Sequence, residues 1–222
     1  MEVVEDLKRV LWHELGHLCI GILFCEKNET YFNSSLEVSY FELAHKWGGK
    51  VSKNKIDKSK DLIQDIDNAL LAIIDLGMGC VFQTLYINEI LNKEESLSKC
   101  LCYQSGCPGA DDIQKMGFIV VLLRENYVRK NISLLDFFNK CYELICGNKM
   151  FIKSIMNLVE KYSDFIIEEY NKQGKSREFK YIISDKELDE LEEEVKTIIL
   201  NNSFDSNVII MKNLLNDVVF IE

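Results

Sequence analysis

Apolar residues recur along the first 24 positions at the spacing of a helix face. Val3, Val4, Leu7, Val10 and Leu11 alternate with charged residues, and the apolar run then continues through position 24. This pattern predicts a buried amphipathic helix. Gly16 lies within it, although glycine costs about 1 kcal/mol relative to alanine in a helix. We therefore expect another part of the molecule to approach the helix backbone closely at Gly16.

The next apolar pattern has the period of a strand. The stretches 36–43 and 46–51 contain alternating and aromatic residues and a Gly48-Gly49 pair, which predict a small β hairpin or meander. Helical periodicity returns from about residue 57 to residue 91, where Gly77 and Gly79 would permit a bend or close packing against another helix. The segment 92–109 is predicted to be a loop.

Helical periodicity also dominates the second half of the chain. A helix is expected to start at Asp111 or Asp112 and to reach about residue 129, because Pro108-Gly109 interrupts the preceding segment. Similar patterns predict helices over 133–146, 150–170 and 185–200. The tail from Asp205 fits either a helix or a strand.

Composition supports a mainly α fold in a single domain. The 222 residues include one proline and are 47% hydrophobic, and no Pro-, Gly- or Ser-rich stretch divides them. We therefore predict one compact helical domain over residues 1–222, with a small hairpin or meander beside the first helix.

Charge and cysteine content restrict the partners and the compartment. A net charge of -10 opposes binding to nucleic acid or to an anionic membrane surface. The most apolar stretch, 69–90, is interrupted by Asp75, Gln83 and Asn88, which argues against a membrane span. Eight cysteines without a signal peptide favour a reducing, cytoplasmic location. Cys100, Cys102 and Cys107 are close in sequence, but they lack a fourth ligand at a convincing spacing.

The sequence His13-Glu14-Leu15-Gly16-His17 lies within the first predicted helix. Two histidines four residues apart project from one helix face and can bind one metal ion, and the glutamate between them can act on an attacking water. The motif therefore predicts a hydrolytic zinc site with His13 and His17 as ligands. The alternative is a pair of ordinary core histidines, although these are two of the 3 histidines in the chain.

A catalytic zinc needs a third protein ligand, which spacing alone does not identify. Acidic or histidine candidates occur at several downstream positions, namely Asp111, Asp112, His45, Glu168 and Glu169. A downstream histidine at the short metzincin spacing is absent, which excludes that group.

The motif order resembles the peptidase domain of the FtsH-type ATP-dependent zinc proteases. The zinc-helix motif is followed by a glycine-containing helix at 76–79 and by the segment 105–113, which is similar to the family's Ser/Thr-Gly-Ala-x-x-Asp-Leu/Ile motif. The resemblance covers about residues 1–142 and leaves 143–222 as a C-terminal helical extension. It implies that Asp112 completes the zinc site, and it implies a helical domain with a sheet edge near the cleft.

The chain also departs from the family. It has neither the phosphate-binding ATPase motif nor the membrane helices that precede the peptidase in the family. The resemblance makes a separate ATPase and further copies of the chain, as a homo-oligomer, candidate partners, but the sequence identifies neither an ATPase nor a ring interface. An acidic position of the glycine-containing helix is occupied by Gln83. This replacement raises the question of what orients the histidine rings.

Together these features predict a zinc metalloendopeptidase that hydrolyses peptides or unfolded proteins. Glu14 would be the general base, and the substrate would lie extended along 36–43 or 47–51. A non-catalytic regulatory or binding module that keeps this scaffold is the alternative. A structural helical protein with a coincidental motif is a third reading.

Overall fold

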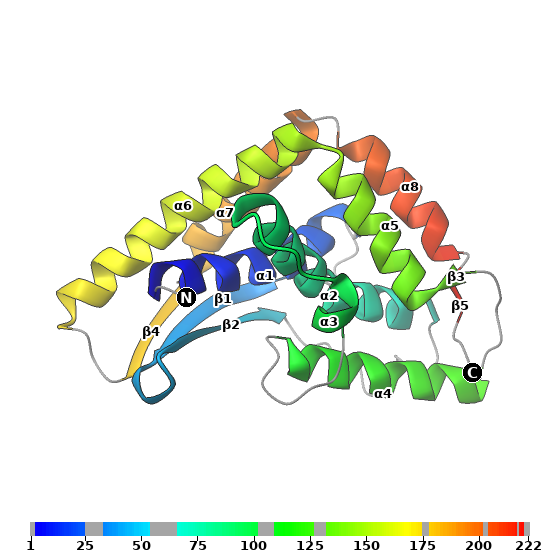
Figure 1. Cartoon of the computed structure of the whole chain (residues 1–222), viewed down its shortest axis with the longest axis horizontal. Helices are drawn as coiled ribbons and strands as arrows, with labels where there is room; N and C mark the ends of the chain where they lie inside the picture. Colours follow the sequence, from blue (N-terminus) through cyan, green and yellow to red (C-terminus); the bar gives the residue numbers. More distant parts are fainter. Residues whose placement is uncertain are drawn as a thin grey trace.

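The protein is mainly helical and carries a small antiparallel sheet, as the sequence predicts (Figure 1). The computed structural model describes residues 3–24, 33–53, 66–101, 109–126, 132–174, 178–201, 204–216 and 218–219. Within these ranges, no helix combines the length and the apolar character needed to cross a membrane.

Helix α1 (Val3–Phe24) runs through the centre of the molecule (Figure 1). The sheet, α2, α6 and α7 all pack against it. Leu7, Trp12 and Leu18 are fully buried, and the histidine motif is buried as well. The prediction of a buried helix is therefore confirmed, and burial on several sides explains why α1 is apolar beyond one face.

The main sheet contains three strands in the order β2-β1-β4. Strands β1 (Asn33–Phe41) and β2 (Lys46–Lys53) form the predicted hairpin, joined by the short helix η1 (Glu42–Ala44) and by His45 at φ 48°. Strand β4 (Glu178–Ser184) pairs with the other edge of β1. Because β1 is central, it has no free edge, and the prediction that a substrate could pair along 36–43 is wrong. Among the described strands, the outer edge of β2 is unpaired, so the predicted pairing of a substrate along 47–51 stays a prediction.

The sequence analysis did not identify β4. Its seven residues bury Phe179 and Ile183 and expose Glu178 and Lys180. This alternation is short and is flanked by two long helical patterns, so local periodicity gives it little weight. Pairing with β1, which is distant in sequence, is what makes the segment a strand.

Helix α2 (Ile66–Leu85) continues into a π-helical turn, η2 (Tyr86–Ile90). The predicted helix from residue 57 is thus observed from Ile66 onward, and 57–65 lie outside the described residues. The predicted loop 92–109 contains a four-residue helix, α3 (Leu97–Cys100), and 102–108 lie outside the described residues. Helix α4 (Ala110–Asn126) starts where expected, and its predicted end near residue 129 lies outside them.

The C-terminal elements complete the same core. Helices α5 (Leu134–Cys146), α6 (Lys149–Lys172) and α7 (Asp185–Asn201) match the predicted ranges within a few residues. The tail forms α8 (Asp205–Asn216), and β5 (Val218–Val219) pairs in parallel with β3 (Ile132–Ser133). One hydrophobic cluster contains residues from both halves of the chain, because α6 and α7 pack on α1.

Gly16 marks the closest approach of α1 to α2. A Cβ atom at Gly16 would lie 2.6 Å from the carbonyl oxygen of Met78, which real Cβ atoms do not tolerate. This contact explains why glycine occupies a helical position where alanine has the better intrinsic propensity. The expectation from the sequence, that some group lies close against the backbone at Gly16, is confirmed, and the group is the backbone of α2.

We expect Gly16→Ala to lower the free energy of unfolding by about 1–3 kcal/mol or more, because the two helices must separate to admit the methyl group. The matched control is Gly117→Ala in α4, where a Cβ atom meets nothing within 4 Å. That substitution should raise the stability by up to about 1 kcal/mol. Urea unfolding followed by circular dichroism measures both, and equal effects of the two substitutions would contradict the close contact.

Candidate metal centre

His13 and His17 lie on successive turns of α1 and face the start of α4. Both side chains are buried, and their Nε2 atoms are 3.1 Å apart. The Oδ2 atom of Asp112, in the first turn of α4, lies 3.2 Å from His13 Nε2 and 3.4 Å from His17 Nε2. Within the described part of the chain, these residues form the one group of three or more side chains placed to share a metal ion.

The three atoms form a triangle with the dimensions of a metal site. Tetrahedral zinc with bonds of about 2.0–2.1 Å separates its ligand atoms by about 3.3 Å. The observed separations are 3.1, 3.2 and 3.4 Å. Two imidazole nitrogens and a carboxylate oxygen therefore fit a divalent cation without rearrangement of the helices. This donor set is also used by metals other than zinc.

The other candidate ligands lie elsewhere. Asp111 precedes Asp112 on α4 but is exposed. His45 is exposed at the β1–β2 turn, and Glu168 and Glu169 form ion pairs with Lys172 on α6. The alternatives that spacing left open thus separate in space, and only Asp112 reaches the histidines.

Helix α2 orients the ring of His17. The Nδ1 atom of His17 lies 2.8 Å from the backbone carbonyl of Asp75, and a carbonyl can only accept a hydrogen bond. Nδ1 therefore carries a proton, and Nε2 is the nitrogen that can bind a metal once its own proton is displaced. Gly79 on α2 makes room for both rings, since a Cβ atom there would lie 2.7 Å from the Nε2 atoms of His13 and His17.

Gln83 does not take part in orienting the histidines. Its Oε1 atom accepts a hydrogen bond of 2.9 Å from Arg9, and its amide nitrogen lies 3.8 Å from Cys100 Sγ. The residue of α2 that contacts His17 is instead Asp75, two turns earlier, which was not among the site residues predicted from the sequence. The available signal was that Asp75 interrupts an otherwise apolar helix.

Glu14 lies beside the triad and contacts the edge strand of the sheet. Its side chain is 4% exposed, and its Oε2 atom accepts a hydrogen bond of 2.9 Å from the backbone N–H of Val51 in β2. Burial raises the pKa of Glu14 above that of an ordinary glutamate, against the opposing effect of His13 and His17. A carboxylate held in this way is suited to accept a proton near neutral pH.

The electrostatic field at the triad favours positive charge. Burial acts to lower the pKa of His17, but hydrogen bonds to Asp112 and Asp75 raise it to about 10. Burial likewise acts to raise the pKa of Asp112, but the hydrogen bonds from His13 and His17 hold it well below its ordinary value. The negative potential that stabilises a proton on His17 would equally stabilise a metal ion at the same place.

Two carboxylates of α1 hold β2 in register with the helix. Asp6 accepts a hydrogen bond of 2.7 Å from Trp47 N–H, and Glu14 accepts one from Val51 N–H. Eight residues of helix span about 12 Å and four residues of strand about 13 Å, so the two spacings match. Asp6 is itself fixed by Arg9 through hydrogen bonds of 2.8 and 3.0 Å.

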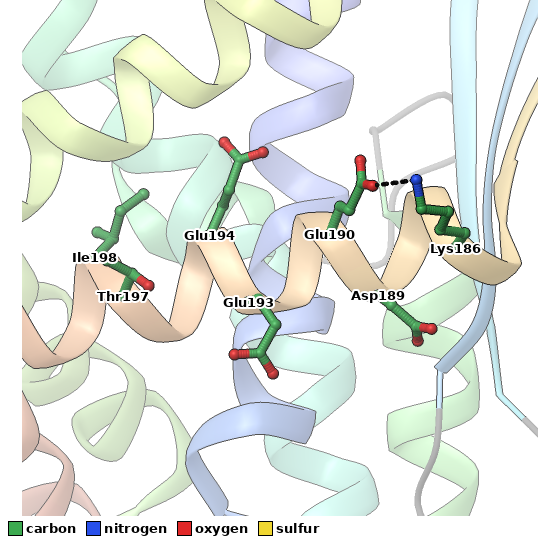
Figure 2. Close-up of a pocket in the computed structure, with 7 residues that line it drawn as sticks. All are labelled: Lys186, Asp189, Glu190, Glu193, Glu194, Thr197 and Ile198. Atoms are coloured by element: carbon green, nitrogen blue, oxygen red, sulfur yellow. Dashed lines mark ion pairs between the residues drawn. The ribbon is translucent and has the colours of Figure 1, made fainter.

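The triad opens into a cleft of about 1390 Å³ between α1, α2, α4 and the edge of β2. Cys100 lines this cleft, whereas Cys102 and Cys107 lie outside the described residues. A second groove lies along α7, and all of its lining residues come from that helix (Figure 2). Among the described residues it contains no group placed to share a metal ion.

Comparisons of the chain with protein-family models, with curated proteins and with solved structures found no match. The resemblance to the FtsH-type peptidases therefore stays a prediction from the motifs. The geometry of the site is the independent observation on which a functional proposal can be built.

Proposed function

We propose that the protein is a zinc-dependent metallopeptidase that cleaves peptides or unfolded protein segments. The observation that supports this proposal is the placement of Glu14 between the His13–His17–Asp112 triad and the edge strand β2. A general base, three metal ligands and a strand edge for an extended chain are the elements that metal-assisted peptide hydrolysis needs.

Each residue has a defined role in the proposed reaction. His13, His17 and Asp112 would hold the ion, which would act as a Lewis acid and would lower the pKa of an attacking water to about 7. Glu14 accepts the proton of that water and then delivers it to the departing amine. The Val51 N–H fixes the direction of the Glu14 carboxylate through one oxygen, so the other is available for the proton.

Glu14 also supports zinc-dependent hydrolysis over oxygenase chemistry, which uses the same set of metal ligands. Two histidines and one carboxylate also bind iron in oxygenases, where the remaining positions are left for oxygen and a cosubstrate. A buried carboxylate next to the metal position is instead suited to take a proton from water. The supporting residue for hydrolysis is therefore Glu14 and not the triad alone.

We expect the zinc-loaded protein to cleave fluorescently labelled, unfolded casein, and we expect a chelator to abolish the cleavage. Restoring zinc should restore the activity, because the ligands remain folded around their positions. Product fluorescence and mass spectrometry of the fragments measure the reaction. Cleavage that persists after complete removal of the metal would contradict the proposal, and zinc binding without any turnover would favour a regulatory module.

A further inference from the structure

The rim of the triad cleft is rich in lysine. Five exposed lysines line it, and they come from three parts of the fold: β2, the segment from η2 to α3, and α4. They are Lys46, Lys50, Lys93, Lys99 and Lys115. The acidic residues of the rim are Glu95 and Asp111. This excess of positive charge is unusual for a chain with 36 acidic and 26 basic residues.

The charges deeper in the cleft are largely compensated. Asp6 and Arg9 form a buried ion pair of 2.8 Å. Glu14 and Asp112 would together balance the two positive charges of a bound zinc ion, and Asp75 lies 3.6 Å from His17 Nδ1. Lys115 is paired with Asp112 at 3.3 Å, so Lys46 and Lys50 on β2 are the rim lysines on which an acidic ligand would depend.

Lys46 and Lys50 lie on β2, and their side chains are on the sheet face opposite to Gly49, the position that contacts Glu14. They are four residues apart on one strand, which places them on the same face about 13 Å from each other. Lys50 directly precedes Val51, whose N–H binds Glu14. Across the sheet Lys50 pairs in register with Glu37, but Glu37 is already held by Lys180 at 2.6 Å. Among the described residues, Lys50 therefore has no ion-pair partner.

The groove on α7 shows the opposite character. Asp189, Glu190, Glu193 and Glu194 project from α7, and Lys186 is the basic residue among those drawn, paired with Glu190 at 3.1 Å (Figure 2). An acidic ligand would be repelled there and attracted to the triad cleft. The charge distribution thus discriminates between two concave surfaces of the same molecule.

We propose that the triad cleft selects acidic peptides, with carboxylate side chains on either side of the bond to be cleaved. This inference rests on the proposed peptidase function, which it extends to a substrate class. In an extended peptide beside β2, side chains four residues apart share a face and have the same spacing as Lys46 and Lys50. Glutamate or aspartate at those positions would form ion pairs with both lysines.

Binding of three labelled decapeptides tests the proposal. Each peptide contains four glutamates, four glutamines or four lysines in an alanine and serine background, and the zinc-loaded Glu14→Gln protein is used so that binding is separated from cleavage. We expect the glutamate peptide to bind at least about tenfold more tightly than the glutamine peptide at low salt, with the preference falling as salt is added. Fluorescence anisotropy measures the affinities.

The double variant Lys46→Gln, Lys50→Gln should lose most of this preference. The matched control is Lys140→Gln, Lys186→Gln, because both lysines are exposed on other helices and pair within them. Equal binding of the three peptides, or an unchanged preference in the first double variant, would overturn the proposal. Tighter binding of a single-stranded DNA decamer than of the glutamate peptide would also overturn it and would indicate a nucleic-acid ligand.

The outcomes separate this inference from the proposed function. If the wild-type protein cleaves casein without preference for acidic sites, the peptidase proposal stands and the acidic selectivity fails. If the glutamate peptide binds through Lys46 and Lys50 but no peptide is cleaved, the acidic ligand stands and the hydrolytic function fails.

Discussion

Glu14→Gln is expected to abolish peptide hydrolysis while leaving zinc bound. The amide of glutamine cannot accept a proton from water, so the turnover number should fall by about 10²–10⁴-fold. The ligands His13, His17 and Asp112 are untouched by the substitution. Hydrolysis of labelled casein, together with zinc content by elemental analysis, measures the two effects on one sample.

Glutamine has nearly the same shape as glutamate, so the substitution should not disturb the packing around position 14. A glutamine oxygen can still accept the hydrogen bond from Val51 N–H, so α1 and β2 should keep their register. A suitable control is Glu143→Gln, because Glu143 is exposed on α5 and pairs with Lys140 in the same helix. It should retain full activity. Full activity in the Glu14→Gln protein would exclude Glu14 as the base and would require a different mechanism.

Periodicity predicts the helices of this fold well because most of them bury one apolar face against a shared core. Helix α6, for example, buries Phe151, Ile155, Leu158, Tyr162 and Ile166 at helical spacing. The segments that periodicity misses are either fixed by a distant partner or too short to show a period. Strand β4 depends on β1, and the four-residue helix α3 is too short for a periodic signal.

In the candidate site, too, some features follow from the local sequence and others depend on residues that are distant in the chain. The spacing of His13 and His17 on one helix determines that both rings share a face, and the sequence alone is enough to predict this. The third side chain comes from α4, and five candidates are compatible with the sequence. Asp75 contacts His17 through its backbone carbonyl at 2.8 Å and its Oδ1 atom at 3.6 Å, and although its place in an apolar helix is visible in the sequence, the ring that it meets is not. The sequence therefore predicts the two ligands that lie on one helix, but it does not predict which residue from a distant helix joins them.

The position of β2 limits how a substrate can bind. Trp47 N–H and Val51 N–H, two residues on either side of Gly49, already donate to carboxylates of α1. An incoming strand that paired along the whole edge would have to displace both carboxylates. Pairing centred on Gly49 avoids this cost, and it brings the peptide backbone next to Glu14.

The substitutions His17→Ala and Asp112→Ala test the triad itself. Loss of a residue that only supports a metal ligand typically lowers metal affinity about 10–100-fold, and loss of either ligand should lower zinc affinity by more than that. Each substitution removes one corner of a triangle whose edges are 3.1–3.4 Å, and a two-ligand site does not hold a catalytic ion firmly. Competition with a chromophoric chelator measures the affinity, and far-ultraviolet circular dichroism verifies that the helices persist.

The adjacent Asp111→Ala substitution is the matched control. Asp111 is exposed in the first turn of α4, so its loss should remove only a helix-terminal charge interaction of about 0.3–1 kcal/mol and should leave zinc binding intact. If Asp111→Ala lost zinc and Asp112→Ala kept it, the register of α4 against α1 would be wrong by one residue. If both kept it, α4 would contribute no ligand, and the first helix would have to bind the ion with a different partner.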